Sequence, residues 1–370
     1  MRSNNVLGFI FAATLDDKIP ELASSRTTAS VPIGGKYRII DFDLSNMSNS
    51  GISNVGIVAK SNFQSLMDHV GSGSAYDLSK RRSNLSILPP YDGKAFSSFV
   101  ETIYNMHGYI EHCREEYVLI SQGNVITNID YTDVFDFHSK KKADITLIYK
   151  NHAIPQGYDR PITLDVDNEG KVNQIFVKPG VVDKGVFNHA YGSILIKKDL
   201  LMSEIRNAIS VNQLDVRRLI QSSLGKYSIY AYENKGYCAA ISSINDYFEF
   251  NMDLMKKEVR DELFNPQRPI YTKVRDDAPS RYGLTSNVKN SIIAQGCVIN
   301  GDVENCVISK GVYVGEGAKL SNCIVMQDTK IGCNTNLNYV IIDKDVTIKD
   351  GRSLMGYDSY PIYIAKKSVV

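Results

Sequence analysis

Residues 286–370 carry an internal repeat, which restricts the possible folds more than any other feature of this sequence. Copies of a short motif begin at Asn290, Asn305, Asn322 and Asn338, at spacings of 15, 17 and 16 residues. Apolar residues also return at every sixth position, in two runs: Val312, Ala318 and Ile324, and Val325, Ile331 and Leu337. Hexads with glycine or asparagine at corners that need positive φ are typical of a β-solenoid with three short faces per coil. The alternative, an irregular β-sandwich, would alternate with a period of two.

The chain from residue 6 to about 260 alternates strand-like apolar runs with helical stretches. The clearest strands are Val6 to Ala13, Val55 to Ala59, Tyr117 to Ser121 and Ile145 to Tyr149. This alternation predicts a layered α/β domain with a mainly parallel sheet. Ligands of open α/β sheets bind at the carboxyl ends of strands, so we expect the chemistry just after Ala13 and just after Ser121.

A proline-bearing stretch separates the two regions. Pro266, Pro269 and Pro279 fall between residues 264 and 285, where they cannot continue a helix or a central strand. We therefore predict an α/β domain at residues 1–262, a linker at 263–285 and a β-helix at 286–370.

Composition excludes several function classes. The 42 Lys and Arg residues nearly balance the 41 Asp and Glu residues, and the clusters at 80–82 and 140–142 are interpreted as solvated surface. We therefore expect no nucleic-acid partner. No apolar run reaches the roughly 18 residues that span a bilayer, and no secretory signal is evident, so we expect a cytoplasmic protein without a membrane partner. The six cysteines form no CxxC pair and are interpreted as small core residues.

The strongest motif lies between residues 31 and 52. Val31 to Phe42 reads Val-Pro-Ile-Gly-Gly-Lys-Tyr-Arg-Ile-Ile-Asp-Phe, and Leu44-Ser45-Asn46 and Asn49-Ser50-Gly51-Ile52 follow it. This run resembles the signature of the bacterial ADP-glucose pyrophosphorylase (glucose-1-phosphate adenylyltransferase) family. Shorter matches extend the resemblance over nearly the whole chain: Ser65-Leu66 with His69, Asp130-Tyr131, Lys178-Pro179, Gly236-Tyr237 and Asn251-Met252-Asp253-Leu254.

The resemblance implies a fold and an activity. The fold is a Rossmann-like (GT-A type) nucleotidyltransferase domain followed by a left-handed parallel β-helix of hexapeptide repeats, which agrees with the pattern above. Active members join glucose 1-phosphate to ATP and release pyrophosphate, with magnesium held by aspartates.

The phosphate-binding loop of the family is replaced in this chain. A glycine-rich turn lets backbone N–H groups approach phosphate oxygens, but the corresponding positions begin Ala13-Thr14-Leu15-Asp16-Asp17. Each new carboxylate would cost on the order of 3 kcal/mol against a phosphate at 5 to 6 Å and an effective dielectric of 20. The family's Lys-Pro dipeptide reads Thr28-Ala29, which removes a cation.

The two metal-binding aspartates of the family are also replaced. The first corresponds to Asn124 and the second to Ala240. Magnesium in such sites is held by one or two carboxylates plus substrate phosphates, so these replacements predict a chain without metal, cofactor or catalytic residues.

A few positions keep a binding potential. Lys178 survives from the family's sugar-phosphate motif, although the neighbouring glutamate is Val177 and the family's sugar-site serine is Ala190. Arg26 lies where basic effector-binding residues cluster in relatives, so both basic residues are candidates for a sugar phosphate or effector. We expect Lys36 and Arg38 to support structure through local ion pairs with Asp41 instead.

Three functions remain to be compared. The first is the regulatory, non-catalytic type of subunit in this family, which would modulate a catalytic paralogue in glycogen biosynthesis. Such a subunit would belong to a hetero- or homo-oligomer, which we expect to be a tetramer. A sugar phosphate would be its effector. The second is a divergent active nucleotidyltransferase that uses other carboxylates, such as Asp16, Asp17 or Asp130. The third, a hexapeptide acyltransferase, is disfavoured because no histidine falls in the repeat.

Overall fold

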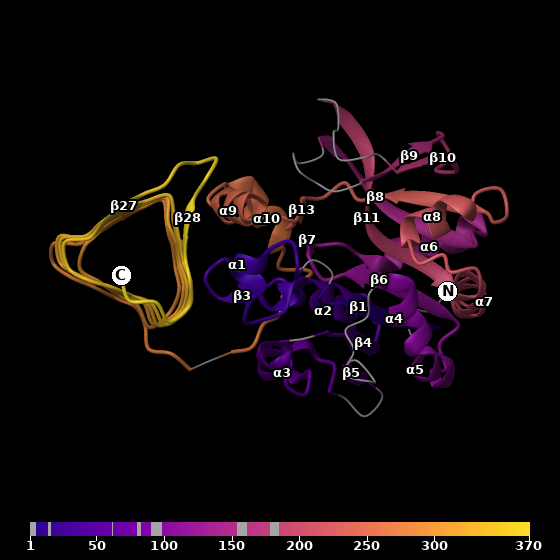
Figure 1. Cartoon of the computed structure of the whole chain (residues 1–370), viewed down its shortest axis with the longest axis horizontal. Coiled ribbons are helices and arrows are strands. Elements are labelled where there is room, and N and C mark those ends of the chain that lie inside the picture. The colour runs from indigo at the N-terminus through magenta and orange to yellow at the C-terminus, as the bar shows by residue number, and fades with distance from the viewer. Residues whose placement is uncertain are drawn as a thin grey trace.

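Two structural units follow one another along the chain and lie side by side, as Figure 1 shows. The computed structural model describes residues 5–13, 16–60, 62–79, 83–89, 98–153, 161–177, 185–274 and 276–370. The last helix of the α/β domain ends at Leu263, and the first strand of the solenoid, β14 (Arg281–Tyr282), pairs in parallel with β17 (Val298–Ile299). This strand lies inside the segment predicted as a linker.

A nine-stranded sheet forms the middle of the α/β domain, with the path β10-β9-β11-β6-β1-β4-β5 and with β8 paired to β11 and β12. Its strands are β1 Val6–Phe11, β4 Asn54–Val58, β5 Asn84–Leu88, β6 Tyr117–Gln122, β8 Ile145–Ala153, β9 Ile162–Val166, β10 Val172–Val177, β11 Val186–Lys197 and β12 Ile229–Glu233. The two small sheets pair β2 Pro32–Ile33 with β3 Tyr37–Arg38, and β7 Val125–Thr127 with β13 Cys238–Ala240.

The prediction of a mainly parallel sheet is wrong. Strands β5, β4, β1 and β6 run parallel, but β11 is antiparallel to β6, β8 and β9, and β10 is antiparallel to β9. The segments between β8, β9, β10 and β11 are shorter than the dozen or more residues that a parallel crossover needs. The four predicted strands themselves are confirmed as β1, β4, β6 and β8.

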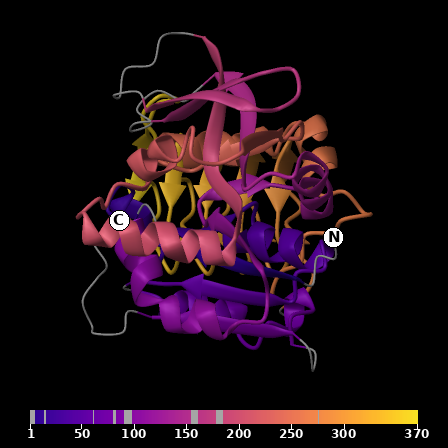
Figure 2. The same cartoon turned by 90° about the vertical axis from the view of Figure 1, so that its right-hand side faces the viewer.

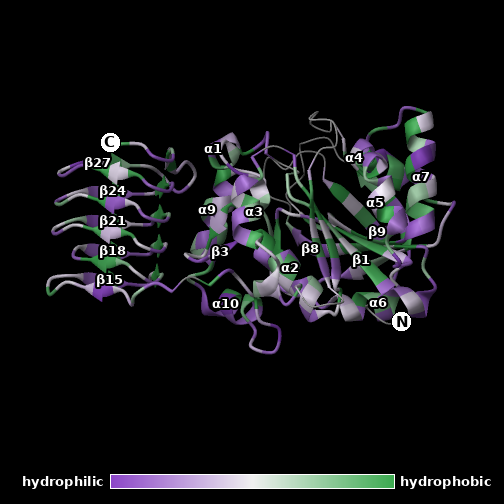
Figure 3. Cartoon of the chain, turned by 90° about the horizontal axis from the view of Figure 1, so that it is seen from below, coloured by the Kyte–Doolittle hydropathy of each residue, from purple (hydrophilic) through white to green (hydrophobic). Residues whose placement is uncertain are grey.

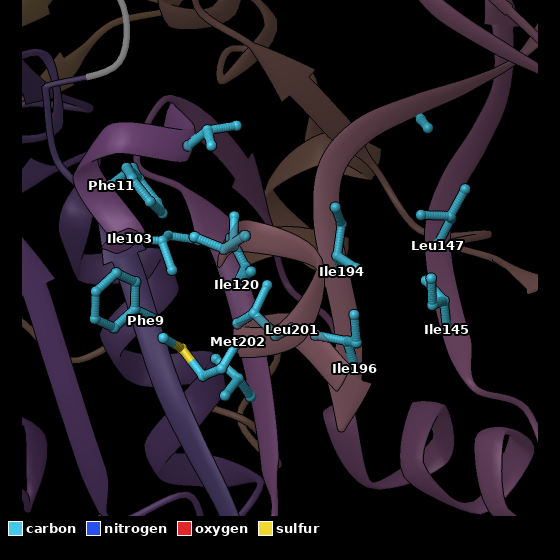
Figure 4. Packing of buried hydrophobic residues seen from close by; sticks show 14 of the residues in the cluster. Phe9, Phe11, Ile103, Ile120, Ile145, Leu147, Ile194, Ile196, Leu201 and Met202 are labelled. Carbon is cyan, nitrogen blue, oxygen red and sulfur yellow. The ribbon is translucent and has the colours of Figure 1, made fainter. Parts of the chain in front are cut away.

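Helices cover both faces of the sheet, which gives three layers (Figure 2). One face packs against α4, α5 and α7 through the apolar cluster drawn in Figure 4, which includes Phe9, Ile103 and Leu201. The other packs against α2, α3 and α6 through Leu44, Leu66 and related residues. The helix bounds are α1 Pro20–Ala23, α2 Ile40–Asn49, α3 Gln64–Val70, α4 Phe99–Asn105, α5 His107–His112, α6 Tyr131–Lys141, α7 Lys198–Ser210, α8 Val216–Ser222, α9 Ile244–Asp253, α10 Lys257–Leu263, and the 3₁₀ turns η2 Thr28–Ser30 and η3 Ser74–Tyr76.

The solenoid consists of three parallel five-stranded sheets, whose coils are stacked in Figure 3. The first sheet is β14, β17, β20 Tyr313–Val314, β23 Lys330–Ile331 and β26 Thr347–Ile348; the second is β15 Asn287–Lys289, β18 Asp302–Glu304, β21 Lys319–Ser321, β24 Asn336–Asn338 and β27 Ser353–Met355; the third is β16 Ile292–Ile293, β19 Val307–Ile308, β22 Ile324–Val325, β25 Val340–Ile342 and β28 Ile362–Ile364. This arrangement confirms the predicted parallel β-helix.

One corner of the repeat differs from the sequence alignment. Asn290, Asn305 and Asn322 adopt positive φ as expected, but the next corner is Tyr339 at φ 53°, not Asn338. The strand pairing places Ile324 opposite Ile341, so this coil is 17 residues long. The side chain of Asn338 instead accepts a hydrogen bond from the side-chain amide of Asn322.

The third sheet of the solenoid packs against the α/β domain. Ile324, which the hexad pattern counts among the inward residues, belongs to an apolar cluster with Phe248, Phe250 and Leu254 of α9 and its C-terminal turn. Its neighbour Val325 lies inside the solenoid. This interface holds the two units together and brings residues from both of them to the site described next.

Candidate functional site

The carboxyl ends of β1 and β6, after which the sequence predicts the chemistry, lie side by side because the two strands pair in parallel. Gly123 lies so close to β1 that an added Cβ would be 2.8 Å from the carbonyl oxygen of Phe11 and 3.0 Å from the Cβ of Ala29. The turn after β1, the segment around η2 and the turn after β6 therefore surround one place. Ala13 in the first of these turns is buried.

A carboxylate of the chain itself binds at this place. Asp16 accepts hydrogen bonds from the backbone N–H of Thr28 at 2.8 Å and from its hydroxyl at 2.7 Å. Burial raises the pKa of Asp16, and the two hydrogen bonds from Thr28 oppose that rise. The N–H at the start of η2, a donor of the kind that binds phosphate oxygens, thus already has an anionic partner.

The two positions of the family's metal-binding aspartates are neighbours in the structure. The backbone carbonyl of Asn124 accepts a hydrogen bond from the backbone N–H of Ile241. The side-chain NH₂ of Asn124 donates to the backbone carbonyl of Ile241. Ala240 pairs with Val125 across the β7–β13 ladder. One neutral amide and one methyl group do not fit a magnesium ion, which needs carboxylate charge.

Apolar and aromatic side chains fill the space beside these positions. Tyr191 packs with Val125 and Ala240 in a small buried cluster. Its hydroxyl lies 2.5 Å from Nε2 of His152, whose ring stacks on that of Tyr191 with centroids 5.2 Å apart. Ala190, the replaced sugar-site serine, is buried next to Tyr191. These contacts are those of a packed protein interior.

The other carboxylates proposed as substitutes are engaged elsewhere or exposed. Asp130 accepts a hydrogen bond from the N–H of Thr132 at the start of α6 and lies 3.7 Å from Arg268. Asp17 is exposed. In the described part of the chain, no group of three or more histidine, cysteine or acidic side chains is placed to hold a metal ion.

Arg26 lies at the domain interface. Its guanidinium donates to both oxygens of Asp343, at 2.7 and 2.6 Å, and the two side chains are almost completely buried. Asp343 lies in the solenoid between β25 and β26 and also accepts from the hydroxyl of Tyr363 at 2.7 Å. Arg26 is therefore bound by an internal carboxylate, and the structure does not present it to an effector.

A basic pocket of about 340 Å³ lies between the domains, close to this ion pair. Its basic side chains are Lys36 and Arg38 of the signature segment, Lys273 and Lys310, together with His69. The remaining lining residues are Pro32, Gly35, Tyr37, Asp68 and Gln327. Its volume lies in the range of small-molecule sites, and cations from both domains converge on it.

Few carboxylates balance these cations. Lys310 lies 3.7 Å from Asp277, and the ammonium of Lys36 lies 4.8 Å from the ring centroid of Tyr37. The guanidinium of Arg38 donates to the carbonyl and hydroxyl oxygens of Ser65. Such a pocket is suited to an anion with several oxygens, because lysine and arginine bind phosphate groups through their N–H donors.

The ion pairs predicted for Lys36 and Arg38 are not formed. The Asp41 carboxylate accepts from the backbone N–H of Arg38 and from the hydroxyl of Tyr76, and its other close partner is His69 at 2.6 Å. Because Asp41 is used in this way, the two basic side chains extend toward the pocket.

Sequence reasoning did not find Lys273 and Lys310. One lies just before the solenoid and the other in its second coil, and neither belongs to a motif that marks a ligand. Only the packing of the two domains brings them to the signature segment.

Thr14 and Lys178, two of the predicted site positions, lie outside the described residues. None of the described helices has the length and apolar character that a membrane crossing requires.

Comparisons with known proteins agree with this architecture. Residues 17–257 match the family model described as "Nucleotidyl transferase", and residues 273–360 match "GlmU-like, C-terminal hexapeptide". The chain is 32% identical over 370 residues to the "Glycogen biosynthesis protein GlgD" of Bacillus subtilis (strain 168), covering 99% of this chain and 97% of that protein. It is 37% identical over 326 residues to the GlgD of Geobacillus stearothermophilus, with coverages of 85% and 83%.

A catalytic relative is nearly as similar. The chain is 30% identical over 365 residues to the "Glucose-1-phosphate adenylyltransferase" of Bacillus cytotoxicus, covering 95% of both chains. Together with the match of the nucleotidyl transferase model over more than half of the sequence, these similarities show that the chain belongs to the nucleotidyl transferase family that contains the GlgD proteins and the glucose-1-phosphate adenylyltransferases.

Proposed function

We propose that this chain is a non-catalytic, regulatory subunit that modulates a catalytic glucose-1-phosphate adenylyltransferase paralogue in cytoplasmic glycogen biosynthesis. The observation that carries this proposal is the bond between Asp16 and Thr28, because an internal carboxylate occupies donors suited to a nucleotide phosphate. Nucleotidyl transfer depends on stabilising negative charge at the reacting phosphates. In this cleft the carboxylate of Asp16 adds negative charge where a nucleotide phosphate would need positive charge or N–H donors.

The neutral positions Asn124 and Ala240 support the same proposal. Each lost factor of ten in rate corresponds to 1.36 kcal/mol of transition-state stabilisation, so the absence of both carboxylates and the presence of Asp16 together reduce turnover by many such factors. The packing of Tyr191 against Val125 and Ala240, next to the replaced serine position Ala190, is a further support for it.

The basic pocket supports the regulatory part of the proposal. We propose that it binds a small phosphorylated effector such as a sugar phosphate, since Lys36, Lys273 and Lys310 converge there from separate parts of the chain. A ligand held by both domains binds more tightly to one interdomain arrangement than to another. It therefore shifts the population of these arrangements, and a neighbouring subunit can respond to that shift.

A two-stage experiment tests the proposal. The pure chain is first incubated with ATP, magnesium and glucose 1-phosphate, and no pyrophosphate release above background is expected. It is then mixed with the catalytic paralogue, and we expect co-elution in size-exclusion chromatography, with a mass near that of a tetramer, and a change in the rate or effector response of the catalytic subunit.

Two results would contradict the proposal. Pyrophosphate release by the isolated chain that disappears in an Asp130→Ala variant would favour a divergent active enzyme. Absence of co-elution over a range of protein concentrations, with an unchanged catalytic rate, would exclude the regulatory role.

A further inference from the structure

A second pocket, of about 580 Å³, lies in the α/β domain and shares no lining residue with the basic pocket. Its walls are the start of α6, the ends of β8 and β12, and the turn between β9 and β10. This volume is in the range of small-molecule sites. The proposed function makes no use of this pocket.

Carboxylates outnumber cations in the walls of this pocket. The acidic lining residues are Asp130, Asp133, Asp167, Glu169 and Glu233, and the basic ones are Lys235 and Arg268. The pocket therefore has the opposite charge to the basic pocket, and it favours a positively charged ligand over a phosphorylated one.

Two of these carboxylates already have a cation of the chain beside them. Asp130 lies 3.7 Å from Arg268, and Glu169 lies 3.4 Å from the ammonium of Lys141. The other three form no ion pair within the part of the chain that the structure describes. Their negative charge is thus available to a ligand.

Three aromatic rings accompany the carboxylates: Phe137, Tyr149 and Tyr232. The rings of Phe137 and Tyr232 meet edge to face, with centroids 5.6 Å apart. Burial raises the pKa of Tyr232 and the charge of Asp133 adds to that rise, so this carboxylate acts close to the ring. Burial and Glu233 have the same effect on the pKa of Tyr149. Aromatic faces beside carboxylates bind organic cations.

The chain places one of its own ammonium groups in such surroundings at the rim of the pocket. Nζ of Lys141 lies 5.6 Å from the ring centroid of Tyr230 as well as 3.4 Å from Glu169. The ring of Tyr230 in turn packs against Phe137 with centroids 6.2 Å apart. An alkylammonium group thus already lies against the edge of the same aromatic cluster.

An unpaired hydrogen-bond acceptor also belongs to the wall of the pocket. Asn128 lines it and is only 7% exposed. Its side-chain NH₂ donates to the carbonyls of Leu263 and Arg268, but its Oδ1 is buried without a hydrogen-bond partner among the described residues. An ammonium group of a ligand would supply an N–H donor of the kind that this oxygen lacks.

The distribution of the carboxylates distinguishes between kinds of cation. In the described part of the chain, no group of three acidic side chains gathers around one point to hold a metal ion. The acidic residues instead come from α6, from the β9–β10 turn and from β12. A single small ion cannot contact all of them, whereas a flexible chain with several ammonium groups can.

We propose that this pocket binds a di- or polyamine, whose ammonium groups pair with Asp133, Asp167 and Glu233 and whose methylene chain packs on Phe137 and Tyr232. The inference does not depend on the proposed function. Because the three carboxylates are exposed, each attraction is weak and screened by salt, so the affinity comes from several of them acting together.

Calorimetry with spermidine tests this inference on the full chain, at neutral pH and low ionic strength. We expect binding at one site, with an affinity that falls when sodium chloride is added. n-Butylamine has the carbon chain of a lysine side chain and a single charge, and it should bind about tenfold more weakly or less. Magnesium chloride should also bind about tenfold more weakly or less, since the carboxylates do not converge.

Matched variants locate the site. Asp133→Asn with Glu233→Gln removes two exposed charges and should weaken spermidine binding about tenfold, at about threefold for each charge. Glu316→Gln removes an exposed carboxylate of the solenoid and should leave the affinity unchanged. Tyr232→Leu should weaken binding about threefold, whereas Tyr232→Phe keeps the ring and should not.

Several results would overturn the inference. These are absence of spermidine binding, an affinity that is unchanged in the double variant, and binding of n-butylamine or magnesium as tight as that of spermidine. Sulfate binding to the basic pocket, measured in the same calorimeter, should be equal in all these variants. The failure of this inference is therefore distinguishable from the failure of the proposed function.

Discussion

The cleft of the α/β domain and the pocket between the domains share one segment of the chain, but they differ in charge. The cleft holds neutral or internally paired groups, whereas the pocket holds an excess of cations. On one side of this segment, the donors of Thr28 bind Asp16, and neutral side chains stand at the metal positions. On the other side, Lys36 and Arg38 reach into a pocket with few compensating carboxylates. A binding site is thus recognised less by the residues it contains than by how completely internal groups neutralise their charges.

The pair formed by Arg26 and Asp343 shows the same contrast within the interface. Its two charges are buried and satisfy one another, so the pair fixes the domains without offering a site. Lys310, although nearly as buried, faces a carboxylate only at 3.7 Å and remains part of the pocket. The following predictions test this difference between a closely paired charge and a weakly paired one, in order of decreasing effect.

Removing one partner of the satisfied pair should have the largest effect on stability. Asp343→Ala leaves the Arg26 guanidinium buried without its counter-charge, so the unfolding free energy should fall by about 3–5 kcal/mol. The double variant Arg26→Met with Asp343→Leu removes both charges and should recover most of this loss. Urea denaturation of both variants measures the effect, and equal losses in the two would show that the charge pair is not the cause.

Asp43, a buried residue of α2, should make stability depend on pH. Its carboxyl is buried and accepts a hydrogen bond from Ser121 at 2.6 Å, and burial raises its pKa to about 7 in spite of that bond. Between about pH 4 and pH 7 the folded state therefore holds a proton that the unfolded state has released. The stability from Asp43 is full below pH 4 and is lost as the pH rises to 7.

The matched variant for this prediction is Asp43→Asn, which cannot titrate. Relative to it, the unmodified chain should lose a few kcal/mol of unfolding free energy between pH 4 and pH 7, at about 1.4 kcal/mol per pKa unit. Denaturant titrations at several pH values provide the comparison. A difference that stays constant with pH would mean that Asp43 ionises normally.

Restoring charge to the metal positions should create a cation site in the cleft. The β7–β13 ladder already brings positions 124 and 240 together, so Asn124→Asp with Ala240→Asp should bind magnesium at least tenfold more tightly than Asn124→Asp alone. Calorimetry with magnesium chloride measures this. No gain from the second carboxylate would show that these positions do not face one ion.

Removing one charge from the weakly paired pocket should have the smallest effect. Lys310→Met should weaken sulfate binding to the interdomain pocket about fivefold, close to 1 kcal/mol, because several other cations remain. Lys349→Met, an exposed lysine of the same solenoid, is the control and should leave the affinity unchanged. Equal affinities in the two variants would place the anion elsewhere.

Much of the fold could be predicted from local patterns. Hexads around Val312 and Val325 marked the coils, and apolar runs marked β1 and β6, which pair in parallel and so bring the turns after them to the same edge of the sheet. The replaced residues Asp16, Asn124 and Ala240 could likewise be named, because a motif fixes its neighbours along the chain. Their hydrogen-bond partners could not, since Thr28 reaches Asp16 only through the three-dimensional turn.

The sequence alone therefore determined the two-unit architecture and the loss of the family's charged residues, because periodicity and motifs are properties of neighbouring residues. Only the tertiary structure decided that Ile324 faces the other domain, that Arg26 is bound by Asp343, and that cations from distant segments form one pocket. Whether a buried charge is satisfied depends on which groups packing places beside it, and no spacing along the chain records that.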